Sequence, residues 1–190
     1  DGVEEGGLFK NSRIAVAQGD QEIFVLEMED AVLLKTVFEN TKILKITYNI
    51  KGMLKILSHY NIHVVGGVFD VMLAGYLIGS SQSSCELDYL VWHYLKRPMS
   101  DGPNTADKAK AIGQLHPLLR RELEDKSLLA LFEDIEIPLA FVLFKVEKNG
   151  VNLDLALLKK LSKECAKKID ALTSKLYAMA GEEFNLNSPK

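Results

Sequence analysis

The spacing of apolar residues changes along the chain, and each spacing predicts a kind of element. In "RIAVAQGDQEIFVLE", residues 13–27, two alternating runs are divided by Gln-Gly-Asp-Gln, which predicts a β-hairpin. Helical spacing follows at residues 30–40, with Asp30 as the N-cap. The pattern then predicts a strand at 42–49, a helix at 50–61, an extended piece at 62–65, helices at 69–79 and 85–97, and a loop at 98–105.

After this loop only helical spacing remains. Its clearest part is the last helix, which Asp154 can start as the N-cap and Gly181 can end as the C-cap glycine. The chain is therefore predicted to be a mixed α/β unit to about residue 125, followed by an all-helical segment. The predicted helices are 105–123, 126–136, 138–148 and 154–180. The apolar stripe of the last one consists of Leu155, Leu158, Leu161, Cys165, Ile169, Leu172, Leu176 and Met179.

Composition is that of a globular protein, with 47% hydrophobic and 26% charged residues among 190. No apolar stretch approaches the ~20 residues of a membrane helix, and residues 1–12 lack the basic start and apolar centre of a signal peptide. Cys85 and Cys165 have no metal-type spacing, which favours reduced thiols in a cytoplasmic protein.

Charge is unevenly distributed, although the net charge is only −3. Residues 1–30 carry eight acidic and two basic side chains, whereas residues 159–190 carry seven lysines against four acidic residues. Any contact with a polyanion is therefore predicted at the C-terminal end, and the alternative for these lysines is a solvated helix face.

Ordered motifs in residues 134–190 resemble the start of the polymerase domain in the bacterial DNA polymerase I family, family A. Three of them are Glu136-x-Pro138-Leu139, Gly150-Val151-x-Leu153-Asp154 and Phe184-Asn185-x-Asn187-Ser188-Pro189-Lys190. Further back, Phe69-Asp70-x-Met72-Leu73 and Tyr94-Leu95 resemble that family's 3′–5′ exonuclease domain. The resemblance covers nearly the whole chain.

This resemblance implies an α/β, RNase H-like (DnaQ-like) mixed-sheet domain at residues 1–125. Residues 126–190 would be an all-helical segment leading into the polymerase thumb. The chain would be a truncated fragment of a DNA-directed DNA polymerase of replication and repair, whose polymerase active site lies beyond Lys190. The expected partners are duplex primer-template DNA and the remainder of the polymerase chain, without a membrane. Mg²⁺ would serve the parent polymerase, and no cofactor is expected in the fragment.

The exonuclease chemistry implied by the resemblance requires several carboxylates around two divalent metals. Asn49 matches the family's second motif, but its carboxylate position holds Met53. The third motif places Lys108 at the aspartate position, with Asp107 next to it, and the first motif is not found in residues 1–12. We therefore expect an inactive, degenerate exonuclease domain with no catalytic residues and no metal.

Two further acidic positions could be mistaken for metal ligands. Asp20-x-Glu22 has the residue types and spacing of a nuclease motif, but it falls on the hairpin turn and is interpreted as a solvated turn. Asp70 is retained at a position that is not a metal ligand in the family, so it is predicted to start a helix or to pack. The rival hypothesis is an active, metal-dependent 3′–5′ exonuclease that uses Asp20, Glu22, Asp70 and Asp107.

Other motifs predict little chemistry. His59 and His63 are four residues apart, but the second lies beyond a helix end, so the pair is not expected to bind metal. Trp92 and Tyr94 are predicted to be packing aromatics of a helix rather than a platform for stacking bases.

The end of the chain carries the candidate DNA contacts. Asn185, Asn187, Ser188 and Lys190 match the family pattern, and their side chains suit phosphate and sugar contact without base readout. The alternative is a capped turn in which Ser188 starts the next helix. A second rival function is a non-catalytic scaffold that binds DNA or a protein through the lysine-rich helix 159–175.

Overall fold

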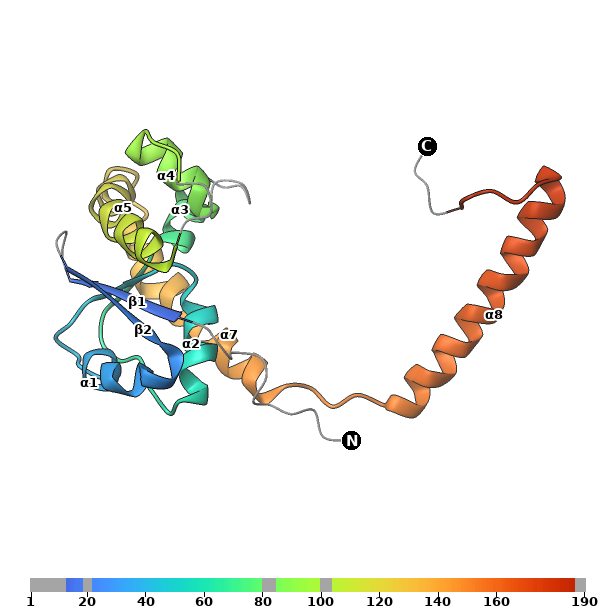
Figure 1. The fold of residues 1–190 in the computed structure, drawn as a ribbon, viewed down its shortest axis with the longest axis horizontal. Helices are drawn as coiled ribbons and strands as arrows, with labels where there is room; N and C mark the ends of the chain where they lie inside the picture. The colour runs from blue at the N-terminus through green and yellow to red at the C-terminus, as the bar shows by residue number, and fades with distance from the viewer. Residues whose placement is uncertain (1–12, 19–21, 80–84, 100–103, 187–190) are drawn as a thin grey trace. The chain divides into compact units, whose positions relative to one another are not determined.

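The computed structural model describes residues 13–18, 22–79, 85–99 and 104–186 (Figure 1). The chain forms two compact units, and the boundary between them in the sequence falls between Asn149 and Gly150. The first unit thus contains the predicted exonuclease-like part together with the helices that follow it to residue 149. Among the described helices, none combines the length and the apolar character needed to cross a membrane.

The predicted hairpin is confirmed. Strands β1 (Arg13–Gln18) and β2 (Glu22–Glu27) pair antiparallel, in a register that places Arg13 opposite Glu27. The Nε of Arg13 lies 2.9 Å from Oε1 of Glu27, so an ion pair joins the two ends of the hairpin farthest from its turn.

The helix predicted at residues 30–40 is partly wrong. The chain forms a 3-10 helix, η1 (Met28–Leu34), and only then a short α-helix, α1 (Lys35–Phe38). The buried residues of η1, Met28 and Ala31, are three apart. This spacing puts them on one side of a helix with three residues per turn, so burial favours the tighter helix.

Strands β3 (Lys45–Thr47) and β4 (Val68–Asp70) pair in parallel, and helix α2 (Ile50–His59) lies between them in the sequence. The predicted helix 69–79 is therefore corrected: α3 spans Val71–Gly79 and a strand precedes it. All three residues of β4 are buried, and a short apolar run without alternation does not separate a buried strand from a helix. Residues 62–65, predicted as extended, form no strand.

The remaining helices of the first unit are α4 (Leu87–Leu95), α5 (Thr105–Asp125), α6 (Leu129–Leu131), a π-helix η3 (Phe132–Glu136) and α7 (Ile137–Asn149). Two separate helices were predicted on either side of Ile137, but the structure continues through Pro138. Proline has no N–H for the carbonyl four residues back and clashes with it. The wider π turn immediately before Pro138 relieves this conflict.

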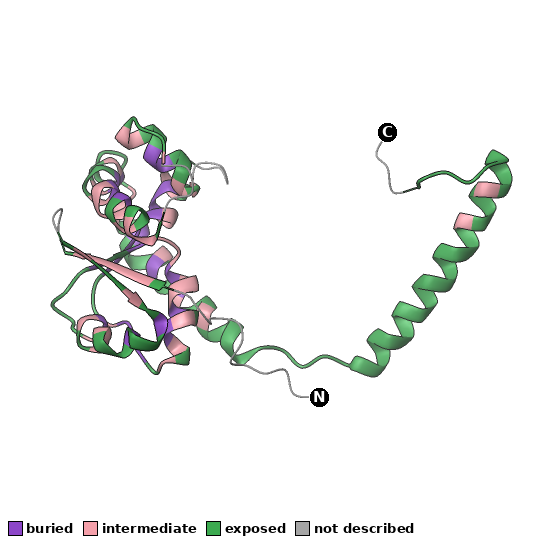
Figure 2. Cartoon of the chain, in the orientation of Figure 1, coloured by how far each residue is buried: buried purple, intermediate pink, exposed green. Residues whose placement is uncertain are grey.

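Helix α5 is central to the core of the first unit. Its residues Ala111, Leu115, Leu119 and Leu123 recur every four positions and are fully buried. The helix contacts β1, β3, α3 and α4. Buried residues also lie in η1, α2, β4 and η3, whereas β1 has none that is fully buried (Figure 2). The Phe69 ring lies 4.8 Å from the Phe132 ring, which ties β4 to η3.

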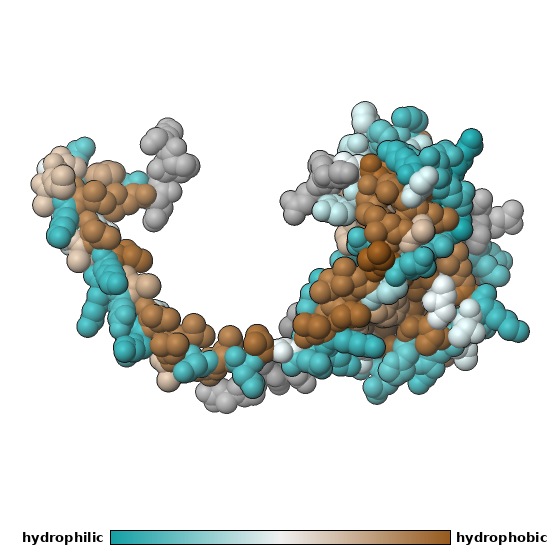
Figure 3. Space-filling model, turned by 180° about the vertical axis from the view of Figure 1, so that it is seen from behind, coloured by the Kyte–Doolittle hydropathy of each residue, from teal (hydrophilic) through white to brown (hydrophobic). Residues whose placement is uncertain are grey.

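The second unit contains α8 (Leu155–Ala180) and its flanking segments, and this helix matches the one predicted at residues 154–180. The carboxylate of Asp154 accepts a hydrogen bond from the N–H of Leu157, and Gly181 ends the helix with a φ of 77°. No side chain of α8 is buried, and its apolar stripe is exposed along the helix (Figure 3).

Candidate site at the ends of the parallel strands

The carboxyl ends of β3 and β4 lie at the same edge of their sheet, because parallel strands end on the same side. Three residues singled out in the sequence follow these strand ends. Asn49 comes two residues after β3, Met53 lies in the first turns of α2, and Asp70 ends β4. The structure thus brings Asn49, at the position of the second exonuclease motif, beside Asp70, a neighbourhood that the sequence did not predict.

Asp70 is completely buried and its two carboxylate oxygens are occupied by backbone donors. Oδ1 accepts hydrogen bonds from the N–H of Asn49 at 3.0 Å and of Met72 at 2.9 Å. Oδ2 accepts one from the N–H of Ile50 at 2.7 Å. The carboxylate therefore receives N–H groups at the starts of two helices, α2 and α3, whose first N–H groups lack partners within the helix.

Burial raises the pKa of the Asp70 carboxyl above its usual range, and the backbone hydrogen bonds oppose this effect in part. The predicted role of Asp70 as a helix-start residue is confirmed. Its contact with α2 was not predicted, because the donors at Asn49 and Ile50 lie 20 or more residues away in the sequence.

Asn49 acts as the N-cap of α2. Its φ is 62°, a left-handed conformation that asparagine adopts more readily than most residues, and its Oδ1 accepts a hydrogen bond from the N–H of Gly52 at 3.0 Å. A Cβ at position 52 would lie 3.0 Å from Nδ2 of Asn49. The glycine at this motif position thus gives the capping side chain its space.

Met53 and Lys108 occupy the positions where the family resemblance places carboxylates. The hydroxyl of Thr47 donates to Sδ of Met53 at 3.4 Å, so the thioether faces the end of β3. Lys108 is exposed in the first turn of α5, which Asn104 caps by accepting a hydrogen bond from the N–H of Asp107. Glu22 is exposed at the start of β2, and Asp20 lies outside the described residues.

The donor set at this edge does not fit a divalent metal. Hard cations such as Mg²⁺ take several oxygen ligands, whereas here the one carboxylate already accepts three N–H groups and its neighbour is a thioether. Within the described ranges, no group of three or more histidine, cysteine, aspartate or glutamate residues could hold a metal ion. His59 lies in the last turn of α2 and His63 lies beyond that helix.

At the C-terminal end, the structure describes Asn185 but not Asn187, Ser188 or Lys190. The hydroxyl of Tyr177 donates to the carbonyl of Phe184 at 3.1 Å, and the two rings lie 5.7 Å apart. The segment that carries Asn185 is thus held against the last turns of α8.

A buried lysine was missed in the sequence. Lys45 is 6% exposed, and its ammonium donates to the carbonyls of Asn40 at 2.7 Å and Ile43 at 2.9 Å, and to the carbonyl of Val65. Burial lowers the pKa of this lysine. The sequence predicted only a short strand at Lys45. It gave no sign of these acceptors, because all three carbonyls belong to loops.

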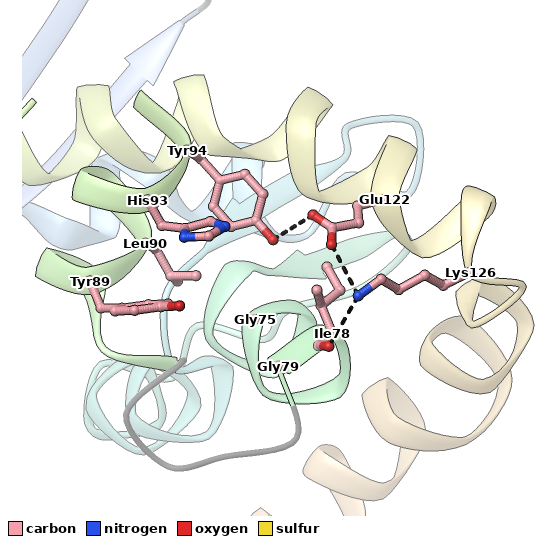
Figure 4. Close-up of a pocket in the computed structure, with 9 residues that line it drawn as sticks. All are labelled: Gly75, Ile78, Gly79, Tyr89, Leu90, His93, Tyr94, Glu122 and Lys126. Atoms are coloured by element: carbon pink, nitrogen blue, oxygen red, sulfur yellow. Dashed lines mark hydrogen bonds and ion pairs between the residues drawn. The ribbon is translucent and has the colours of Figure 1, made fainter. Parts of the chain in front are cut away.

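A second polar cluster joins α3, α4 and α5 (Figure 4). The hydroxyl of Tyr94 donates to Oε2 of Glu122 at 2.6 Å, and Nζ of Lys126 lies 3.1 Å from Oε1. Lys126 also donates to the carbonyl of Ile78 at 3.3 Å. Burial and the bond to Glu122 raise the pKa of Tyr94. Burial also acts to raise the pKa of Glu122, but hydrogen bonds from Tyr94 and Lys126 outweigh burial and lower it.

This cluster borders a cavity of about 190 Å³, which the ring of Tyr89 and the imidazole of His93 also line. Tyr94 packs, as predicted. The same prediction for Trp92 is wrong, since 62% of this residue is exposed. The helix spacing of α4 places Trp92 on the outer face, because the inner face is taken by Leu90 and Val91.

Comparison with protein families matches residues 10–125 to a 3′–5′ exonuclease family model. The chain therefore belongs to the 3′–5′ exonuclease domain family of the family A DNA polymerases. This confirms the resemblance seen in the sequence, and with it the α/β character of the domain.

Relatives at about 30% identity extend the match over nearly the whole chain. The chain is 31% identical to DNA polymerase I of Bacillus subtilis over 98% of its own length and 22% of the relative's. It is 34% identical to DNA polymerase I of Pseudomonas aeruginosa over 85% of its length and 21% of the relative's. The chain thus spans about a fifth of the length of these relatives.

The fold is shared with a solved structure described as the POL domain of Pol1 from M. smegmatis in complex with DNA primer-template and dNTP. The TM-score is 0.73 at 27% identity, over 90% of this chain and 31% of that chain.

Proposed function

We propose that this chain is part of a DNA-directed DNA polymerase of replication and repair, in which its exonuclease-like domain has a structural role and does not hydrolyse DNA. Residues 1–125 would form that domain, and residues 126–190 would begin the polymerase domain. The polymerase active site and its Mg²⁺ ions would belong to the remainder of a longer, cytoplasmic protein. The relatives, all named DNA polymerase I, support this assignment.

One observation carries the structural role. The carboxylate of Asp70, at the edge where the family resemblance expects metal chemistry, is committed to three backbone N–H groups of α2 and α3. A carboxylate that already accepts three N–H groups at two helix starts is a poor ligand for two metal ions. Met53 and Lys108, a thioether and a cation, supply no replacement.

The RNase H-like arrangement is part of the proposal. The antiparallel pair β1–β2 and the parallel pair β3–β4 are separate two-stranded sheets among the described residues, and α5 contacts strands of both. A mixed sheet of RNase H-like type would join them through one further strand. By resemblance, that strand is the one that carries the first pair of metal-binding carboxylates.

A nuclease assay tests the proposal. The chain is incubated with a 3′-labelled single-stranded oligonucleotide at millimolar Mg²⁺ or Mn²⁺, beside an authentic 3′–5′ exonuclease. We expect no release of labelled nucleotide above background. Metal-dependent release that Asp70→Asn or Asp107→Asn abolishes would establish the active exonuclease instead.

A second candidate function is DNA binding by the C-terminal unit. It is favoured by the exposed lysines of α8, which carry no described ion pair, and by Asn185 beside the end of this helix. The amides of Asn185 and Asn187, the hydroxyl of Ser188 and the ammonium of Lys190 would contact the backbone of duplex DNA. The lysines of α8 concerned are Lys159, Lys160, Lys163, Lys167 and Lys168.

Duplex binding by the chain, measured by anisotropy over a range of salt concentrations, tests this second function. If α8 contacts the DNA, charge reversal of the five lysines should abolish binding. If the end of the chain contacts the DNA, alanine at Asn185 and Lys190 should weaken binding. Duplex affinity that neither set changes would exclude the C-terminal unit as the contact.

A further inference from the structure

The outer face of α4 carries large aromatic side chains that the fold does not use. Leu90 and Val91, on the inner face, are 1% and 0% exposed, so the core already holds this helix. Tyr89 and Trp92 lie on the other side, and 37% and 62% of these residues are exposed. Aromatic residues at a surface leave much apolar area in water, and tryptophan and tyrosine are enriched where surfaces bind partners.

Two rings on this face present parallel planes. The imidazole of His93 lies against the ring of Tyr89, with centroids 5.4 Å apart and planes 16° apart, as Figure 4 shows. Trp92 precedes His93 in the sequence, and both residues are exposed. Nucleobases stack on such rings regardless of sequence, because every base has a π face.

Positive charge follows the rings. Lys96 and Arg97, both exposed, come directly after α4, and in the described part of the chain neither forms an ion pair. Nη2 of Arg97 donates to Oε1 of Gln114 at 3.1 Å, a neutral group that leaves the charge uncompensated. These cations can neutralise phosphates.

The acidic groups near the face do not cancel this charge. Glu122, beside His93, is bound by Tyr94 and Lys126. Glu86 and Asp88 are exposed at the opposite, N-terminal end of α4, so a polyanion would lie over the C-terminal half of the helix. Two of the rings, Trp92 and His93, lie in this same half, whereas Tyr89 lies beside Asp88.

The cavity at the foot of the rings adds a place for one base. It measures about 190 Å³, and Tyr89, His93 and Leu90 line it together with Glu122. A glutamate oxygen accepts hydrogen bonds from exocyclic amino groups, as on cytosine. A base with such a group would therefore meet both an aromatic wall and an acceptor.

We propose that the outer face of α4, formed by Tyr89, Trp92, His93, Lys96 and Arg97, binds single-stranded DNA by stacking bases on its rings and pairing phosphates with its cations. The choice of DNA over RNA rests on the proposed function. The binding itself does not, because it requires no nuclease chemistry and would stand if the nuclease assay were positive. An acidic peptide is the competing partner, since it would match the cations but has no bases to stack.

Trp92 is the single tryptophan in the sequence, so its emission reports directly on this face. Titration of the chain with a short oligodeoxycytidylate should quench the emission to saturation, and added salt should weaken the binding. Lys96→Glu should weaken binding and lower the salt dependence by about one phosphate. Lys55→Glu, on the exposed side of α2, is the matched control and should leave both unchanged.

Anisotropy of a labelled oligonucleotide measures the variants that lack the tryptophan. Trp92→Ala should weaken binding roughly 5-fold or more, since stacking one base is worth ~1–3 kcal/mol and 1.4 kcal/mol is tenfold. Trp92→Phe keeps a ring and should fall between Trp92→Ala and the parent chain. Phe24→Ala removes an exposed ring from β2 and should have no effect.

Three results would overturn the proposal. One is an oligonucleotide that leaves the Trp92 emission unchanged. Another is equal quenching by an abasic strand of the same length, which would remove stacking from the account. The last is equal quenching by polyglutamate, which would assign the face to an acidic peptide.

Discussion

Asp70 offers the most direct test of how this domain is held together. Asparagine at this position has the same shape, but one oxygen becomes an NH₂ group that must face a backbone N–H. The orientation of least cost places the NH₂ at Ile50, because Oδ2 accepts one hydrogen bond and Oδ1 accepts two. One buried donor then lacks an acceptor, which costs ~1–3 kcal/mol.

Asp70→Ala leaves all three donors without an acceptor. The full penalty would be about three times larger, but water entering the small space and relief of a buried charge reduce it, so we expect ~3–5 kcal/mol. The predicted order of unfolding free energies is therefore parent, then Asp70→Asn, then Asp70→Ala. Asp88→Asn, on the exposed side of α4, is the control and should stay within about 0.5 kcal/mol of the parent.

Urea unfolding at pH 7, followed by circular dichroism, measures these differences. The same experiment with millimolar Mg²⁺ should not move the midpoint of the parent chain, because a metal that binds only the folded state would raise it. The reasoning would be refuted if both Asp70 variants matched the parent in stability, or if Mg²⁺ stabilised the parent but not Asp70→Asn.

Four further substitutions test individual positions. Gly66→Ala should cost ~2–4 kcal/mol, because φ is +79° and a Cβ would lie 2.7 Å from the carbonyl oxygen of Thr41; Gly113→Ala in α5, where a Cβ meets nothing within 4 Å, should instead stabilise by ~0.5–1 kcal/mol. Lys45→Met should lower the free energy of unfolding by ~2–4 kcal/mol in urea titrations, because three carbonyls lose a charged donor; a neutral result would show that water replaces the ammonium. Burial, with help from nearby Arg120, lowers the pKa of His116, so the folded state prefers the neutral ring. The contribution of this residue to the free energy of unfolding is complete above the unfolded pKa of about 6.5 and falls as the pH drops through that value. His116→Gln should therefore reduce the loss of stability between pH 7.5 and 5.5.

The parts of the fold that the sequence predicts are those with a strong local signal. The hairpin has two alternating runs and a Gly-Asp turn, and α8 has a long stripe with a cap at each end, so both follow from neighbouring residues. The strand β4 does not, because a three-residue buried run has no period. The predicted helix break at residue 137 was wrong because proline usually ends a helix, whereas here a π turn lets the helix continue through Pro138.

The same distinction between local and long-range signals applies to the residues of the candidate site. Asn49, Met53 and Asp70 were located by the order of motifs, which depends on the family and needs no coordinates. The bonds of Asp70 to Asn49 and Ile50 and of Lys45 to Val65 were not found, because they cross about 20 residues and leave no periodic trace. Trp92 was misjudged because an aromatic residue in an apolar helix is usually packed, and only the orientation of α4 shows which face is free.

The position of Asp70 also determines how this part of the domain can open. One carboxylate accepts the N–H groups of Asn49, Ile50 and Met72, so the start of α2 cannot unravel without releasing the start of α3. Local fraying at two helix ends is thereby replaced by one shared event. In native-state hydrogen exchange these three amides should open together with a common free energy, which Asp70→Ala would separate into two smaller ones.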